Sequence, residues 1–254
     1  MTQKVGEVTS QEPAEESSAE GLTFPVLLWV TLAIAGLFFT LTLAIYWFDT
    51  PQTPVELALG LSEIGFLAGL LAQNVAIFGS LYGVLVWWRG ISWRDLGLRP
   101  ARKKWLKTTG LIILVFFPLT LALEMAMEHF LGFSFKNLAL GIYAPYGFSW
   151  LSASGLIVIG GMMAPVAEEL YFRGILYGWM RCRWSPTVGM LASSAIFACI
   201  HMQPQVMPEI FLVGVILAWF YERSGSLVPG ILLHMAMNIL ALTWLFSSLA
   251  MGEG

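Results

Sequence analysis

Three charged side chains, Glu168, Glu169 and Arg173, lie inside one long apolar segment of the sequence, between residues 150 and 180. Each unpaired charge at the centre of a membrane helix costs about 2.5 to 3.5 kcal/mol, so we expect these charges to be paired or to do chemistry. Glu169 and Arg173 are four residues apart and share one helix face, where they can form an ion pair. Glu168 points about 100° away from that face and has no local partner. Its carboxylate is therefore the candidate general base.

Two of the three histidines also lie in apolar segments, as Phe197 to His201 and His234 to Asn238. The spacing of four residues places each pair on one helix face. Counted from the neighbouring cationic turns at a rise of about 1.5 Å per residue, both histidines, Asn238 and Glu168 fall within a layer about 12 Å thick. A lone histidine in a membrane helix is usually a packing residue. A carboxylate, two imidazoles and an amide at one depth instead indicate a site inside the membrane.

The composition indicates that these helices are partly solvated by lipid. Hydrophobic residues make up 57% of the 254 residues and charged residues 11%, and the mean hydropathy is +0.75, whereas a soluble domain has about 25% charged residues. The net charge of -3 provides no basic field, which excludes nucleic acid as a partner. Cys182 and Cys199 have the spacing of neither a disulfide framework nor a paired-cysteine metal site, and we expect both to be buried.

Seven apolar stretches predict seven helices. The stretches are 24–48, 64–88, 108–127, 150–180, 186–203, 208–221 and 226–248. Several are long enough to cross about 30 Å of hydrocarbon as a helix. The segment 129–147, which contains three glycines and a proline, can hold a short eighth or re-entrant helix. We therefore predict an all-α, polytopic membrane bundle of about seven to eight transmembrane helices with the active site inside the bundle.

A single domain is the simplest organisation of the chain. Residues 24–254 form one predicted transmembrane helical domain, with a catalytic core at about 155–245. The acidic segment 1–23 has five glutamates and one lysine among polar residues and is predicted to be a disordered tail. Polar residues elsewhere in the spans, such as Asn74 and Glu124, are expected to serve packing or to lie at the membrane interface.

Cationic residues predict the orientation of the bundle. Seven of the 13 lysines and arginines lie between Arg89 and Lys107, and Arg181, Arg183 and Arg223 mark two later turns. Cytoplasmic loops of membrane proteins are enriched in Lys and Arg, so these three loops are predicted to be cytoplasmic. We expect a multi-pass protein of the plasma (inner) membrane whose active site is reached from the cytoplasmic side.

The motif segments resemble the signatures of the CAAX protease and bacteriocin-processing (CPBP) family of intramembrane glutamic endopeptidases, which includes the type II CAAX prenyl endopeptidases. The family patterns are Glu-Glu-x-x-x-Arg, Phe-x-x-x-His and His-x-x-x-Asn. They occur here in the family's order, without substitution at any signature position: Glu168, Glu169 and Arg173, then Phe197 and His201, then His234 and Asn238.

The resemblance implies an intramembrane endopeptidase that uses no cofactor and no metal. In that scheme Glu168 and His201 activate a water for attack on a peptide carbonyl, while His234 and Asn238 surround the developing oxyanion. The supporting residues are Glu169, Arg173 and Phe197. The implied partners are the lipid bilayer and a protein or peptide substrate. The family name suggests prenylated CAAX-type C-terminal tails as the substrate class.

Other interpretations stay open. Glu168, His201 and His234 could supply three ligands to a zinc ion with a water in the fourth position, although the chain has no His-Glu-x-x-His motif. A non-catalytic membrane protein, such as an immunity factor or a scaffold, could keep the same polar layer for recognition. A proton-carrying transporter is disfavoured because the sequence shows no inverted repeat.

Overall fold

The computed structural model describes residues 22–132 and 134–252. Residues 1–21, which make up nearly all of the predicted tail, lie outside the described residues, so the disorder of that tail stays a prediction.

Seven long helical segments form the bundle, as the apolar stretches predict. They are α2 (Phe24–Phe48), α4 (Glu63–Ser80) with its π-helical continuation η1 (Leu81–Trp88), α5 (Lys103–Leu131), a continuous helix from 150 to 183, α10 (Pro186–Ile200), α11 (Met207–Ser224) and α12 (Val228–Ala250). The continuous helix consists of α7 (Trp150–Val158), η2 (Ile159–Met163), α8 (Ala164–Glu169), η3 (Leu170–Tyr177) and α9 (Gly178–Arg183). The short helices are α3 (Pro54–Leu59) and α6 (Phe135–Tyr143).

The predicted fold class is confirmed. Among the described residues there is no strand, and five helical segments are long and apolar enough to cross a membrane: 24–48, 63–88, 103–130, 150–183 and 228–250. Helix α10 is a shorter apolar helix. Helix α6 is the short helix predicted within 129–147, whereas α3 has no counterpart among the predicted helices.

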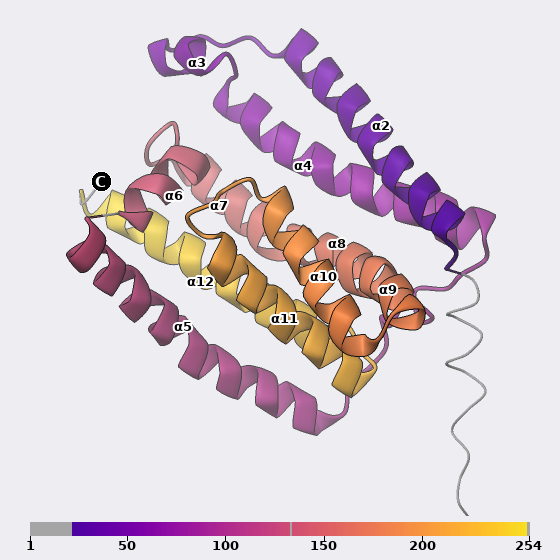
Figure 1. Ribbon diagram of the computed structural model, residues 1–254. Helices are drawn as coiled ribbons and strands as arrows, with labels where there is room; N and C mark the ends of the chain where they lie inside the picture. The colour runs from indigo at the N-terminus through magenta and orange to yellow at the C-terminus, as the bar shows by residue number, and fades with distance from the viewer. Residues whose placement is uncertain (1–21, 133, 253–254) are drawn as a thin grey trace, which may run out of the picture.

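The helices form layers around α12 (Figure 1). Helices α2 and α4 lie side by side and form one side of the bundle, and α5 lies along α12 on the opposite side. The continuous helix, α10 and α11 lie between these two sides, and α12 contacts α5, α7, α8 and α11. All three elements that carry the sequence motifs therefore lie between the α2–α4 side and α5, although α10 keeps one face exposed.

Three connections meet at one end of the bundle, at the lower right of Figure 1. They are the segment 89–102 before α5, the turn between α9 and α10, and the turn between α11 and α12. The segment 89–102 is docked on the turn between α11 and α12. The Leu227 N–H donates to the Gly97 carbonyl at 2.8 Å, and Arg99 and Ser226 also form hydrogen bonds across this contact. Gly97 has φ +94°, and a Cβ there would lie 2.4 Å from Cε2 of Tyr221. Ten Lys and Arg residues lie at this end: seven between 89 and 107, and Arg181, Arg183 and Arg223. We call it the cationic end.

The expectation that both cysteines are buried is wrong, because Cys182 and Cys199 are exposed. Cys199 lies on α10, where an outward helix face meets lipid and a small thiol is as well accommodated as it is in a protein core. Cys182 instead lies in the last turn of α9, at the cationic end. Hydrophobic periodicity alone therefore cannot separate the two environments.

Candidate active site

The continuous helix places both glutamates and Arg173 at the centre of the bundle. Pro165 in its middle has no N–H and so removes one backbone hydrogen bond. The π-helical stretches η2 and η3 lie directly on either side of α8, which begins one residue before Pro165. Such π-helical turns inside α-helices are frequent at functional sites. Two widened stretches thus flank the helical turn that carries the glutamates.

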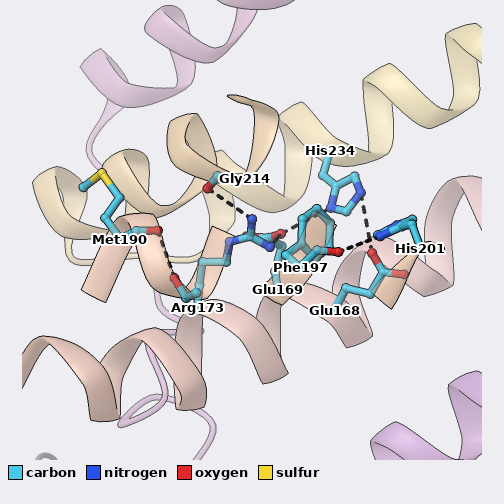
Figure 2. Close-up of polar contacts among 9 residues, drawn as sticks. Glu168, Glu169, Arg173, Met190, Phe197, His201, Gly214 and His234 are labelled. Atoms are coloured by element: carbon cyan, nitrogen blue, oxygen red, sulfur yellow. Dashed lines mark hydrogen bonds and ion pairs between the residues drawn. The ribbon is translucent and has the colours of Figure 1, made fainter. Parts of the chain in front are cut away.

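Arg173 and Glu169 form the predicted ion pair, and both side chains are only 1% exposed. Arg173 donates from Nη1 to Oε1 of Glu169 at 2.7 Å and from Nη2 to the Gly214 carbonyl at 3.2 Å. Its guanidinium carbon also lies 4.4 Å from the ring centroid of Phe197. These contacts with α11 and α10 satisfy part of the buried guanidinium (Figure 2), whereas Oε2 of Glu169 is buried without a hydrogen-bond partner among the described residues.

His234 lies between the two glutamates. Its Nδ1 is 3.2 Å from Oε1 of Glu169, and its Nε2 is 3.7 Å from Oε2 of Glu168. The first distance is a hydrogen bond, in which Nδ1–H donates because the carboxylate only accepts. The second is too long for a hydrogen bond. The Glu168 side chain, at 13% exposure, is therefore held less tightly than that of Glu169.

His201 ends α10 with its imidazole in a fixed orientation. Its Nδ1 is 2.7 Å from the Phe197 carbonyl one turn earlier, and the carbonyl can only accept, so the proton is on Nδ1. In the neutral ring Nε2 is then free to accept a proton. Phe197 is 1% exposed, and its ring lies edge-on to those of His201 and His234 at centroid distances of 4.8 and 5.8 Å. This explains physically why a phenylalanine stands one turn before the histidine.

Asn238 reaches from α12 to the π-helical stretch η2. Its Nδ2 donates to the Gly160 carbonyl at 3.1 Å. The close approach depends on the next glycine, since a Cβ on Gly161 would lie 3.0 Å from Cγ1 of Ile239. An amide nitrogen has two N–H groups, so this bond orients the side chain and leaves one donor for another acceptor.

A cavity of about 540 Å³ joins these residues. All four predicted catalytic residues line this cavity, namely Glu168, His201, His234 and Asn238, and so does Phe197. Figure 2 shows Glu168, His201 and His234 pointing toward one another. Glu169 and Arg173 do not line the cavity. The structure thus brings the predicted residues together, and their catalytic roles stay a prediction.

Sequence reasoning missed several residues of the cavity wall. Three polar residues line the cavity from other helices: Asn74 on α4, Glu124 on α5 and Glu209 on α11. Asn74 and Glu124 were expected only to pack or to lie at the membrane interface, so that expectation leaves out their place in the cavity wall. The polarity of these side chains within apolar segments was a usable signal. Tyr143 on α6 also lines the cavity. Its pKa is raised, mainly by burial and also by the charge of Glu168, while a hydrogen bond with Gln203 partly offsets the rise. An aromatic residue in an apolar sequence gave no signal of this proximity.

The ligand set proposed for zinc was also compared with the geometry. Within the described ranges 22–132 and 134–252, no group of three His, Cys, Asp or Glu side chains is arranged to hold a metal ion. The set Glu168, His201 and His234 therefore does not form a metal site in this arrangement.

The similarity to known proteins covers the region of the site. Residues 149–240 match the family described as type II CAAX prenyl endopeptidase Rce1-like, which confirms the motif resemblance over this range. An Escherichia coli protein named "Uncharacterized 24.3 kDa protein" is 40% identical over 86 residues, which are 32% of this chain and 40% of that protein.

Two further relatives match about a third of the chain. "UPF0177 protein YxdF" of Lactococcus lactis subsp. lactis (strain IL1403) is 27% identical over 81 residues, 31% of this chain and 44% of that protein. "Putative membrane peptidase YdiL" of Bacillus subtilis (strain 168) is 26% identical over 83 residues, 33% of this chain and 34% of that protein. The matches span less than half the length of each relative. No solved structure matches the chain.

Proposed function

We propose that this protein is a membrane endopeptidase of the CAAX-protease type, in the plasma (inner) membrane, and that it hydrolyses a peptide bond with a water activated by Glu168 and His201. The family match over residues 149–240 and the name of the Bacillus subtilis relative support a membrane protease. One observation carries the mechanism: Glu168, His201, His234 and Asn238, from three separate helices, line a single cavity.

In the first step Glu168 accepts a proton from a water in the cavity, and the water oxygen attacks the carbonyl carbon of the scissile bond. The carboxylate is suited to this role because it lines the cavity and has no hydrogen bond as strong as those of Glu169. His201 presents the unprotonated Nε2 of its neutral ring, since Nδ1–H is bound to the Phe197 carbonyl. It can orient the same water or take its proton.

In the second step the tetrahedral oxyanion accepts hydrogen bonds. The second N–H of Asn238 is one donor, held in place by the bond to Gly160. His234 supplies another in its doubly protonated form, in which Nδ1–H donates to Glu169 and Nε2–H points toward Glu168 and the cavity. Collapse breaks the C–N bond, and the proton held by Glu168 or His201 passes to the leaving amine, which yields a free carboxylate and an amine.

The test is cleavage by the purified full chain in detergent. A library of farnesylated C-terminal peptides and the same peptides without the prenyl group are incubated with wild type, Glu168→Ala, His201→Ala and the control Glu128→Gln, each with and without a metal chelator. Glu128 is exposed and does not line the cavity. We expect cleavage by wild type and Glu128→Gln, with or without chelator, and none by the other two variants.

Other outcomes point to the remaining interpretations. Loss of cleavage with chelator would favour a metal-dependent protease. Undiminished cleavage by folded Glu168→Ala would overturn the mechanism. Absence of cleavage by folded wild type across both libraries would favour a non-catalytic immunity or scaffold protein.

A further inference from the structure

We propose that the catalytic cavity is reached from the side of the membrane opposite the cationic end, so that its substrates are peptide segments exposed outside the cytoplasm. The substrate class rests on the proposed function, whereas the side of access rests on the charge distribution and the geometry of the bundle. The sequence predicts access from the cytoplasm, but three structural observations argue for the other side.

The first observation is the separation of charge between the two ends of the bundle. The cationic end has ten Lys and Arg residues, and its acidic residues in the described ranges are Asp95 and Glu222. At the opposite end, formed by 49–62, 132–149 and 201–206 with the adjoining helix ends, the acidic residues are Asp49, Glu56, Glu63, Glu124, Glu128 and Glu209. Lys136 is the single Lys or Arg that the described residues place there. The enrichment of cations in cytoplasmic loops orients the cationic end toward the cytoplasm.

The second observation is the position of the cavity along the bundle axis. Helix α10 begins beside the cationic end at Pro186 and ends at Ile200, directly before His201. At about 1.5 Å per residue this histidine lies more than 20 Å from that end, in a hydrocarbon layer of about 30 Å. The cavity is also lined by Lys136 at the start of α6 and Glu209 at the start of α11. Both of these helix starts belong to the acidic end (Figure 1).

The third observation is that the bundle is filled between the cavity and the cationic end. One continuous buried cluster occupies this region, and its members there include Leu85, Leu96, Ile175, Leu176 and Leu227, each 7% exposed or less. Docking of 92–99 on the α11–α12 turn closes it from outside. A peptide that approached from the cytoplasm would have to displace close-packed side chains, whereas one from the acidic end would meet an existing cavity.

These observations narrow the substrate class. A peptide that reaches the site must present its scissile bond at the outer face of the membrane, as an exported peptide or the outer segment of a membrane-anchored protein does. A CAAX-type tail at a cytoplasmic chain terminus does not meet this condition.

The orientation can be measured with a membrane-impermeant maleimide on right-side-out and inverted vesicles of a bacterial expression host. Native Cys182, exposed at the cationic end, reports that end in a Cys199→Ser background. Gln205→Cys, exposed in the loop between α10 and α11, reports the acidic end when both native cysteines are serine. We expect Cys182 to react only in inverted vesicles and the cysteine at 205 only in right-side-out vesicles. The reverse pattern would overturn the proposal.

Access to the cavity itself is tested with Ala139→Cys on α6, in the same cysteine-free background. This side chain lines the cavity, and we expect the reagent to reach it from the outer side only and to abolish cleavage once bound. Gln73→Cys on α4, which also lines the cavity, repeats the test if the first variant folds poorly. Labelling from the cytoplasmic side, or from neither side, would overturn the proposal. Since labelling requires no substrate, the expected labelling without any cleavage would refute only the proposed function.

Discussion

Two adjacent glutamates of this protein have opposite surroundings. The carboxylate of Glu169 is bonded to Arg173 at 2.7 Å and to His234 at 3.2 Å, and it is 1% exposed. The carboxylate of Glu168 faces the cavity, and Nε2 of His234 lies 3.7 Å from it. The two residues are therefore expected to respond differently to the same substitution, one through stability and the other through rate.

Glu168→Gln should abolish the reaction and leave the fold intact. The amide is isosteric but cannot accept a proton from water, and general-base catalysis contributes about 10²- to 10⁴-fold to a rate. We expect kcat/KM to fall by at least that factor with no change in Tm, measured on a cleaved peptide and by thermal unfolding in the same detergent. If the Tm of the variant fell together with its activity, Glu168 would be needed for the stability of the fold.

Glu169→Gln and Arg173→Met should each destabilise the protein. Removing one partner of a buried ion pair leaves the other charge uncompensated, which costs about 3–5 kcal/mol. The double variant should lose less than the sum of the two single variants, because neither charge is then left alone. Unfolding free energies of the four proteins in one detergent provide the measurement. Additive losses would mean that the two side chains stabilise the bundle independently.

At the scale of helices, the approach of α12 to η2 determines where Asn238 lies. The Gly160 carbonyl accepts its hydrogen bond, and the neighbouring Gly161 has no side chain to hold the helices apart. A π-helical stretch at this point also turns its carbonyls away from the α-helical direction. The oxyanion donor proposed here is thus positioned by a helix contact rather than by its own rotamer.

Gly161→Val should therefore reduce both stability and rate. The Cβ alone would lie 3.0 Å from Cγ1 of Ile239 and 3.7 Å from the backbone Cα and N of that residue. Overpacking of this kind costs about 1–3 kcal/mol, and the displaced α12 would move Asn238 away from the reaction centre. The control is Gly83→Val in η1, where nothing lies within 4 Å of an added Cβ. Equal kcat for the two variants would contradict the positioning role.

The sequence predicted the long helices well and their internal geometry poorly. Continuous apolar runs identify the spans because lipid solvates every outward face, but they do not reveal π-helical stretches such as η2, which depend on contacts with α12. Helix α3 was missed because its six residues are too few to stand out as an apolar run, although its capping box between Thr53 and Glu56 is a local signal that the sequence carries. Backbone hydrogen bonds from 52, 53 and 63 also lower the pKa of Glu56 to about 2.

The candidate site shows the same division. The ion pair of Glu169 and Arg173 was predictable because it lies within one helical turn. The contact between Asn238 and the Gly160 carbonyl joins residues 78 positions apart, and no periodicity in the sequence encodes it. The place of Tyr143 in the cavity depends on how α6 lies across the bundle, which local sequence does not determine.

At the scale of the whole molecule, the candidate catalytic residues and much of the cavity wall come from different parts of the chain. All four candidate catalytic residues lie within 149–240, the range that matches the family. Much of the opposite wall comes from α4, α5 and α6, including Leu70, Leu121 and Tyr143, which precede that range. The same catalytic residues can thus be combined with a different wall, and we expect the N-terminal part of the chain to determine which substrates fit.

Leu121→Trp tests this division, with Leu119→Trp as its matched control. Leu121 lines the cavity, whereas Leu119 on the same helix is 58% exposed and does not line it. An indole in place of Leu121 would fill part of the space of about 540 Å³ and compete with a bulky substrate side chain.

We expect a higher KM for large substrates, with kcat for small ones nearly unchanged, because the ion pair and histidine contacts lie on other helices. The control should match wild type in both constants, since tryptophan is well tolerated at an outward face in lipid. If instead kcat fell equally for small and large peptides, α5 would contribute to the reaction centre itself, and the division between chemistry and wall would be wrong.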